Sequence, residues 1–175
     1  FTTLQPVLMS ILISCSFALL IISPISTIAI GLAIQLDGVA AGAAAMGVGA
    51  TTIVLVVNSW RINKSGITIA IALGAMKMMM PNLFRKPVIL VPCFFTAIVS
   101  ALPVALLGIT GTPSSAGFGL VGLVGPFAAI EGGQSPIMAL ISWIVVPALA
   151  AIVSQYVCEK VLNLYNRQEV FEFLG

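Results

Sequence analysis

Charged residues are absent from four long stretches of this chain. Residues 1 to 36, 38 to 60, 87 to 130 and 132 to 158 contain no Asp, Glu, Lys or Arg. A helix needs about 20 apolar residues to cross a bilayer. The pattern therefore predicts five or six hydrophobic segments near that length, packed as one polytopic, all-α helical bundle in a membrane.

Prolines and polar residues divide the apolar sequence into separate helices. We expect long helices at Val7 to Ile22, Val39 to Val57, Val88 to Leu107 and Pro136 to Val157, with a shorter one from Pro24 to Leu36. Ser23 followed by Pro24 is a helix start signal, because a Ser hydroxyl caps free N–H groups and Pro fits the first turn. Pro147 predicts a kink in the last helix.

The segment from Ser65 to Met76 lies between two basic stretches. Its twelve residues would reach about 18 Å as a helix, well short of a hydrocarbon core of about 30 Å. We therefore expect it to dip into the membrane or lie flat rather than cross. The flanking basic residues then share one face, which the enrichment of Lys and Arg in cytoplasmic loops assigns to the cytoplasm: Arg61, Lys64, Lys77, Arg85 and Lys86.

Residues 108 to 133 hold eight of the sixteen glycines of the chain. Such a stretch does not favour a regular helix. Non-helical backbone at membrane depth is tolerated only where protein or water satisfies its N–H and C=O groups. The sequence therefore predicts a re-entrant element here, with broken helices on either side.

The two halves of the chain follow a similar order of elements. Residues 7–57 and 88–157 each run from an apolar span through a Ser/Thr-Pro break to an acidic residue followed by Gly and a further span. Transporters are often built from such repeats, with solute held at their interface. We expect one transmembrane domain over residues 1–175, a possible internal repeat, and an interfacial cytoplasmic tail at residues 159–175. The copies would be parallel if residues 65–76 do not cross, and inverted if they do.

The composition excludes several classes of protein. Hydrophobic residues make up 60% of the chain and charged residues 7%, with a mean hydropathy of +1.20. Continuous apolar runs argue against a β-barrel. The chain has no His, and its three Cys stand alone in apolar runs, so we expect neither an enzyme nor a metal site. We also expect no cofactor and no nucleic-acid partner. Because the chain begins at Phe1, we expect a partial or processed sequence.

Two carboxylates interrupt the membrane sequence. A charged side chain at bilayer depth costs about 2.5 to 3.5 kcal/mol, and it is retained where it faces a cavity, a partner or a substrate path. An interfacial position remains the alternative for Asp37, whereas Glu131 follows the glycine-rich stretch and is the stronger candidate. Together with nearby hydroxyl and amide side chains they form the candidate substrate-binding set: Asp37, Thr112, Ser114, Ser115, Glu131 and Gln134.

Three motifs resemble a known family. They are Phe1 to Met9 (FTTLQPVLM), Ser23 to Thr27 (SPIST) and, above all, Gly111 to Gly119 (GTPSSAGFG) with Gly122 and Gly125-Pro126. On these residues the chain resembles the stand-alone membrane IIC proteins of the bacterial phosphotransferase system, over roughly the C-terminal half of their domain. The resemblance implies a sugar permease component of the bacterial inner membrane that works as a dimer with separate cytoplasmic IIA and IIB proteins.

The leading hypothesis is transport of a neutral polyhydroxylated solute that hydrogen-bonds to the candidate set. An ionised carboxylate suits sugar hydroxyls because it makes the stronger hydrogen bonds. A membrane-embedded sensor that binds the same solute without moving it is the alternative. An ion or proton pathway through Asp37 and Glu131 is a third reading, weakened by the lack of further ionisable residues. We expect the C-terminus to lie in the cytoplasm.

Overall fold

The computed structural model describes residues 5–174, and all regular elements within them are helices. Three helices are long and apolar enough to cross a membrane: α3 (Gly38–Ser59), Pro87–Leu107, which ends in α6 (Leu90–Leu107), and Pro136–Val161, which contains α10 (Val146–Tyr156). The chain is therefore an all-α polytopic membrane protein. The expected five or six full-length segments were too many, because the other helices in the described residues are shorter.

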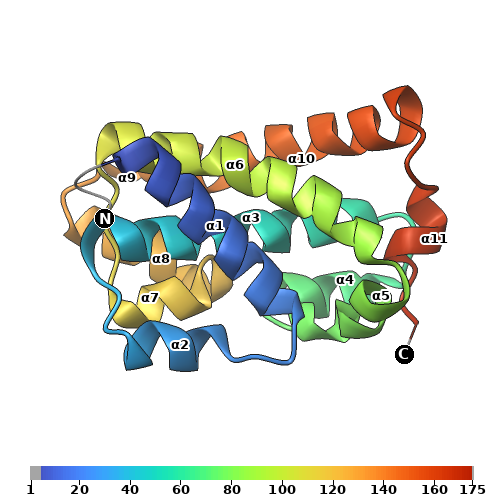
Figure 1. The fold of residues 1–175 in the computed structure, drawn as a ribbon, viewed down its shortest axis with the longest axis horizontal. Helices are drawn as coiled ribbons and strands as arrows, with labels where there is room; N and C mark the ends of the chain where they lie inside the picture. The colour runs from blue at the N-terminus through green and yellow to red at the C-terminus, as the bar shows by residue number, and fades with distance from the viewer. Residues whose placement is uncertain (1–4, 175) are drawn as a thin grey trace.

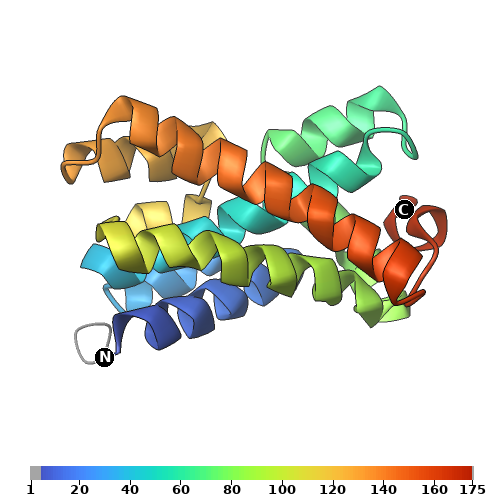
Figure 2. The ribbon, with the colours of Figure 1, turned by 90° about the horizontal axis from the view of Figure 1, so that it is seen from above.

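Helix α3 forms the centre of the bundle (Figure 1). Of the most apolar 18-residue stretch of α3, 78% is buried inside the protein, against 44% for that of Pro87–Leu107 and 39% for that of Pro136–Val161. Figure 2 shows α6 lying between α1 (Pro6–Ile22) and α10, and all three pack against α3. The long helices on the outside keep an apolar face free, which suits contact with lipid.

Small residues allow the other elements to approach α3 closely. A Cβ at Gly47 would overlap the carbonyl oxygen of Ser14 in α1. The Ser14 hydroxyl in turn donates to the carbonyl of Ala97 in α6, at 3.1 Å. A Cβ at Gly42 would overlap the carbonyl of Ile109, so glycine at this position lets the loop after α6 lie against α3.

The bundle has two ends, which we name by one residue each. At the Asp37 end, α3 begins, α6 ends and α9 (Pro136–Leu140) begins; at the Trp60 end, α3 ends and Pro87–Leu107 begins (Figure 1). The remaining elements form short hairpins that start from one end and return to it.

The first hairpin consists of α1 and α2 (Thr27–Ala33), with a break between them. Helix α1 ends at Ile22, as the Ser-Pro pair predicted. The expected cap was wrong, however. Ser26 rather than Ser23 caps α2 by accepting from the N–H of Ala29, while the Ser23 hydroxyl donates back to the carbonyl of Leu20.

The second hairpin starts from the Trp60 end. It consists of α4 (Ser65–Ala72), a 3₁₀ turn (Met76–Met79) and α5 (Met80–Arg85). Helix α4 has eight residues, about 12 Å of helix, and Figure 1 shows α4 and α5 at the end where α3 ends. The segment thus turns back toward the Trp60 end.

The third hairpin starts from the Asp37 end. Helix α7 (Pro113–Phe118) leads inward, a turn with left-handed Gly119 and Gly122 reverses the chain, and α8 (Val124–Glu131) returns. Glycine is required at Gly119, because its φ of 58° is combined with close contact to Val48 in α3.

The last helix contains a π-helical turn at Ile141–Val145, which ends two residues before Pro147. A wider turn accommodates a residue that has no N–H to donate. After a second π turn (Val157–Val161), α11 (Arg167–Phe171) folds back against the Trp60 end. Asn82 holds this tail by donating to the carbonyls of Val170 and Glu172, at 2.8 and 2.6 Å.

Candidate functional site

The three helix breaks meet beside the middle of α3. Gly49 is the twelfth of the 22 residues of α3, and a Cβ there would lie 3.4 Å from the Cβ of Leu120, at the tip of the α7–α8 hairpin. A Cβ at Gly74, at the tip of the α4–α5 hairpin, would lie 2.9 Å from a methyl group of Val121. Hairpins from opposite ends therefore touch halfway along the bundle.

The α1–α2 break joins the same place. The Thr27 hydroxyl donates to the carbonyl of Gly117 at 2.9 Å and is itself buried. A Cβ at Gly117 would overlap the backbone of Ile28, so the main chains of α2 and α7 are in direct contact. The α1–α2 break and the α4–α5 hairpin thus both lie against the α7–α8 hairpin at this level.

A hollow of about 280 Å³ lies between these breaks. Its lining is largely apolar, with polar groups from the hydroxyls of two residues and one ammonium group. The lining residues are Ile21, Ser26, Thr27, Ile28, Leu73, Gly74, Met76, Lys77, Gly117, Phe118 and Val121.

Lys77 is the charged residue of this hollow. Its ammonium group donates to the carbonyls of Ser23, at 2.5 Å, and Ile25, at 2.7 Å, in the α1–α2 break. An ammonium group has three N–H donors, so one remains available. The expectation that Lys77 lies with the other basic residues in a loop at one face is wrong, because its side chain instead reaches the break between α1 and α2.

The predicted polar residues gather at the Asp37 end, away from this hollow. Asp37 accepts from the N–H of Gly38 at 2.8 Å and caps α3. Gly38 in turn accepts from the N–H of Gly111 at 2.9 Å. This pairing brings Asp37 next to the start of α7, and so joins two parts of the candidate set that are far apart in sequence.

Thr112, Ser114 and Ser115 form the cap of α7. The Thr112 hydroxyl accepts from the N–H of Ser115, and the Ser115 hydroxyl accepts from the N–H of Thr112, at 3.2 and 2.8 Å. Ser115 is buried by this arrangement, whereas Ser114 is exposed and lies 3.2 Å from the Thr112 hydroxyl. Capping is thus an established role for Thr112 and Ser115, and Ser114 is the freer hydroxyl.

Glu131 and Gln134 lie where α8 returns to the Asp37 end. Glu131 is exposed, and its neighbour Gly132 packs against the hydroxyl of Thr110. Gln134 donates to the Ser142 hydroxyl at 3.1 Å, while its side-chain carbonyl is buried and has no donor within the described residues. A buried acceptor without a donor is uncommon in folded proteins.

The chain shows similarity to one family of membrane proteins. A family model described as "Phosphotransferase system, EIIC" matches residues 1–171, nearly the whole chain. No curated protein and no solved structure matches it.

Proposed function

The chain belongs to the EIIC family of the phosphotransferase system, and we propose that it moves a neutral polyhydroxylated solute along the helix breaks beside α3. The match extends over the region that carries the three motifs, so the resemblance inferred from the sequence is confirmed. EIIC proteins are membrane components of sugar transport and are not catalytic on their own. The sugar substrate and the IIA and IIB partners follow from that membership.

The convergence of the three breaks carries this proposal. Transporters hold solute where discontinuous helices meet near the middle of the membrane. Here two hairpins from opposite ends touch at Gly74 and Val121, beside the midpoint of α3. Residues 108–133 then form a re-entrant loop, entered and left from the Asp37 end.

We assign the first contacts of the solute to the candidate set at the Asp37 end. Asp37 and Glu131 offer ionised acceptors, which bind hydroxyl donors more strongly than neutral ones do. The Ser114 hydroxyl and the unpaired carbonyl of Gln134 add neutral contacts. Thr112 and Ser115 contribute by fixing the start of α7, and the hydroxyl of Thr112 also faces Ser114.

In the hollow beyond the tips of the two hairpins, we assign the next contact of the solute to Lys77. Its ammonium group fastens the α1–α2 break through Ser23 and Ile25. A solute oxygen entering the hollow would accept from the remaining N–H, and exchange with the two carbonyls would loosen the break. The break then has two states, one with Lys77 bonded to Ser23 and Ile25 and one with Lys77 released from them. Alternating access can use such a pair of states.

The proposal predicts that Glu131→Gln weakens solute affinity while the protein remains folded. Hydrogen bonds to charged groups contribute about 1.5 to 3 kcal/mol, so we expect an affinity loss of about tenfold or more. The measurement is counterflow of labelled glucose, mannitol or galactitol by the chain reconstituted in vesicles. Glu172→Gln is the matched control: Glu172 is an exposed acid in the tail that Asn82 holds at the Trp60 end, so this substitution should leave affinity unchanged.

Three outcomes would contradict parts of this account. Unchanged affinity in Glu131→Gln removes Glu131 from the site. Binding without counterflow favours the sensor. If none of the three solutes binds or is exchanged, the proposal of a neutral solute is contradicted.

We further propose a homodimer in the bacterial inner membrane, with the C-terminus in the cytoplasm and residues 159–175 at the membrane surface.

A further inference from the structure

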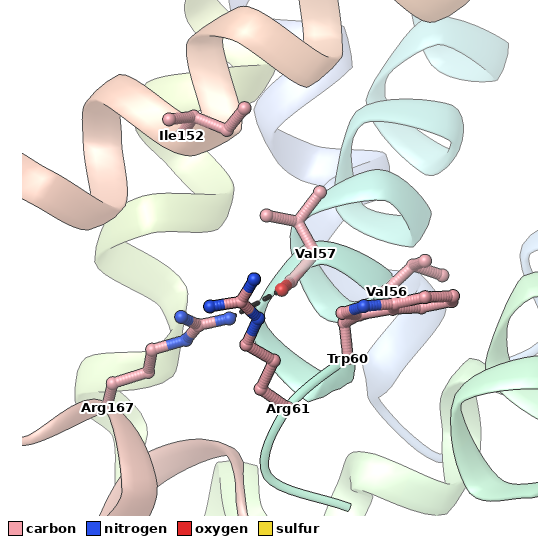
Figure 3. Close-up of a pocket in the computed structure, with 6 residues that line it drawn as sticks. All are labelled: Val56, Val57, Trp60, Arg61, Ile152 and Arg167. Atoms are coloured by element: carbon pink, nitrogen blue, oxygen red, sulfur yellow. Dashed lines mark hydrogen bonds between the residues drawn. The ribbon is translucent and has the colours of Figure 1, made fainter. Parts of the chain in front are cut away.

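A second hollow, of about 550 Å³, lies at the Trp60 end between α3 and α10. Its walls are the aliphatic side chains of Val56, Val57 and Ile152 together with the exposed indole of Trp60. Two arginines, Arg61 and Arg167, complete the lining, and Figure 3 shows both guanidinium groups turned toward the same side of Val57. No residue of the transport proposal lies here.

Arg167 is fixed in place by the end of α3. Its guanidinium group donates to the carbonyls of Val57 and Asn58, at 2.6 and 3.2 Å, and its Nε is buried with no acceptor among residues 5–174. These bonds tie the tail to α3, and because both acceptors are neutral carbonyls they do not neutralise the guanidinium charge. A guanidinium group has five N–H donors, so it can bind an additional anion.

Arg61 is the freer of the two arginines. Its side chain is exposed, and in residues 5–174 it forms neither a hydrogen bond nor an ion pair. Two acids of the tail lie near Arg167 in sequence: Glu169 is paired with Lys86, and the oxygens of Glu159 accept from Gln155 and from the backbone N–H of Arg167. One carboxylate beside two guanidinium groups leaves this part of the surface positively charged.

We propose that this hollow binds the phosphate group of an anionic phospholipid, with an acyl chain along Val56 and Ile152. The combination of an aliphatic wall and two cations fits a molecule that is apolar at one end and anionic at the other. The location agrees, because α3 ends at Ser59 and Trp is enriched where membrane and water meet. Basic pockets between helices at that depth attract anionic headgroups.

The mainly apolar lining favours a lipid over a free anion or a phosphorylated protein. A water-soluble phosphate group gains nothing from Val56, Val57 and Ile152, whereas an acyl chain removes their surface from water. Free phosphate and a protein-bound phosphoryl group are therefore alternatives that the experiment must separate.

The test uses the fluorescence of Trp60, since the chain has two tryptophans and the other, Trp143, is buried. The full chain is reconstituted in phosphatidylcholine bilayers with increasing brominated phosphatidylglycerol, which quenches indole on contact. A parallel series contains brominated phosphatidylcholine. The signal of Trp60 is the difference between the unchanged protein and Trp60→Phe. We expect stronger quenching by the anionic lipid, and an affinity about fivefold lower in Arg61→Gln.

Arg85→Gln is the matched control, because it removes an exposed arginine near the same end that does not line the hollow. It should keep the preference for the anionic lipid. The proposal is overturned if both lipids quench equally or if Arg61→Gln keeps the full preference for the anionic lipid. It is also overturned if Arg85→Gln lowers this preference as much as Arg61→Gln does. Loss of the preference in excess inorganic phosphate would show an anion site without lipid selectivity and would also overturn it.

Discussion

Gly42 and Gly66 differ in what a side chain would meet, and this gives a prediction at the scale of single residues. A Cβ at Gly42 would overlap the backbone of Ile109, whereas nothing lies within 4 Å of a Cβ at Gly66. We expect Gly42→Ala to destabilise the protein by about 1 to 3 kcal/mol, because backbone must move. Gly66→Ala should be neutral or stabilising by up to about 1 kcal/mol, because alanine favours the helix. Thermal unfolding in detergent micelles measures both, and equal effects would contradict the close packing.

Lys77 gives a second prediction at this scale. Lys77→Met keeps much of the length of the side chain but removes the bonds to Ser23 and Ile25. We expect faster hydrogen exchange in residues 23–28 and slower counterflow, since the break is no longer fastened. Lys64→Met, which removes an exposed lysine whose ammonium group forms no hydrogen bond within the described residues, is the control. Unchanged exchange in Lys77→Met would exclude the fastening role.

The sequence could not place Lys77, although it predicted the break that Lys77 reaches. Its position next to Met78 to Met80 and near Arg85 suggested a basic loop. The contact with Ser23 spans 54 positions, so it depends on how two hairpins pack. By contrast, the Thr112/Ser115 cap is local and could be inferred from the Thr-Pro-Ser-Ser order alone.

At the scale of elements, the docking of α11 depends on the buried amide of Asn82. Asn82→Ala would leave the carbonyls of Val170 and Glu172 without their donor. Loss of such a buried partner costs about 1 to 3 kcal/mol, so residues 166–174 should exchange hydrogen faster. Lys86→Gln breaks only the exposed ion pair with Glu169, worth about 1 kcal/mol or less, and should change exchange little. The reverse order of effects would contradict this assignment.

Tyr165 contributes to the same contact between tail and helix. Burial raises the pKa of its phenol, and nearby Cys158, Cys93 and Glu159 add to the effect. The phenol therefore stays protonated at neutral pH and donates to Gln155 at 2.9 Å. Because the bond joins residues ten positions apart, it helps the chain to reverse between α10 and α11.

Helix breaks could be predicted from the sequence better than membrane-spanning helices. Ser-Pro and Thr-Pro pairs act locally, so the end of α1 and the start of α7 follow from neighbouring residues. Hydropathy does not show whether an apolar segment crosses or turns back. That choice depends on close packing at Gly74 and Gly119, which the sequence shows only as two glycines among sixteen.

At the scale of the whole molecule, the proposed repeat remains a prediction. Helix α3 and the helix Pro136–Val161 both start from the Asp37 end, as the parallel arrangement requires. Helices α1 and α6 run in opposite directions, because α1 starts from that end and α6 finishes there (Figure 1). Any symmetry between residues 7–57 and 88–157 therefore extends to part of each half.

The central claim is that residues 108–133 enter and leave the membrane at the Asp37 end. The most direct test is labelling of single cysteines in sealed vesicles by a membrane-impermeant thiol reagent, with peptide mass spectrometry to separate them from the native cysteines. Ser114→Cys and Glu131→Cys, at exposed positions on either side of the hairpin, should both react from one side, and Lys64→Cys should react from the other. Reaction of Ser114→Cys and Glu131→Cys from opposite sides would mean that the segment crosses, and would contradict the account.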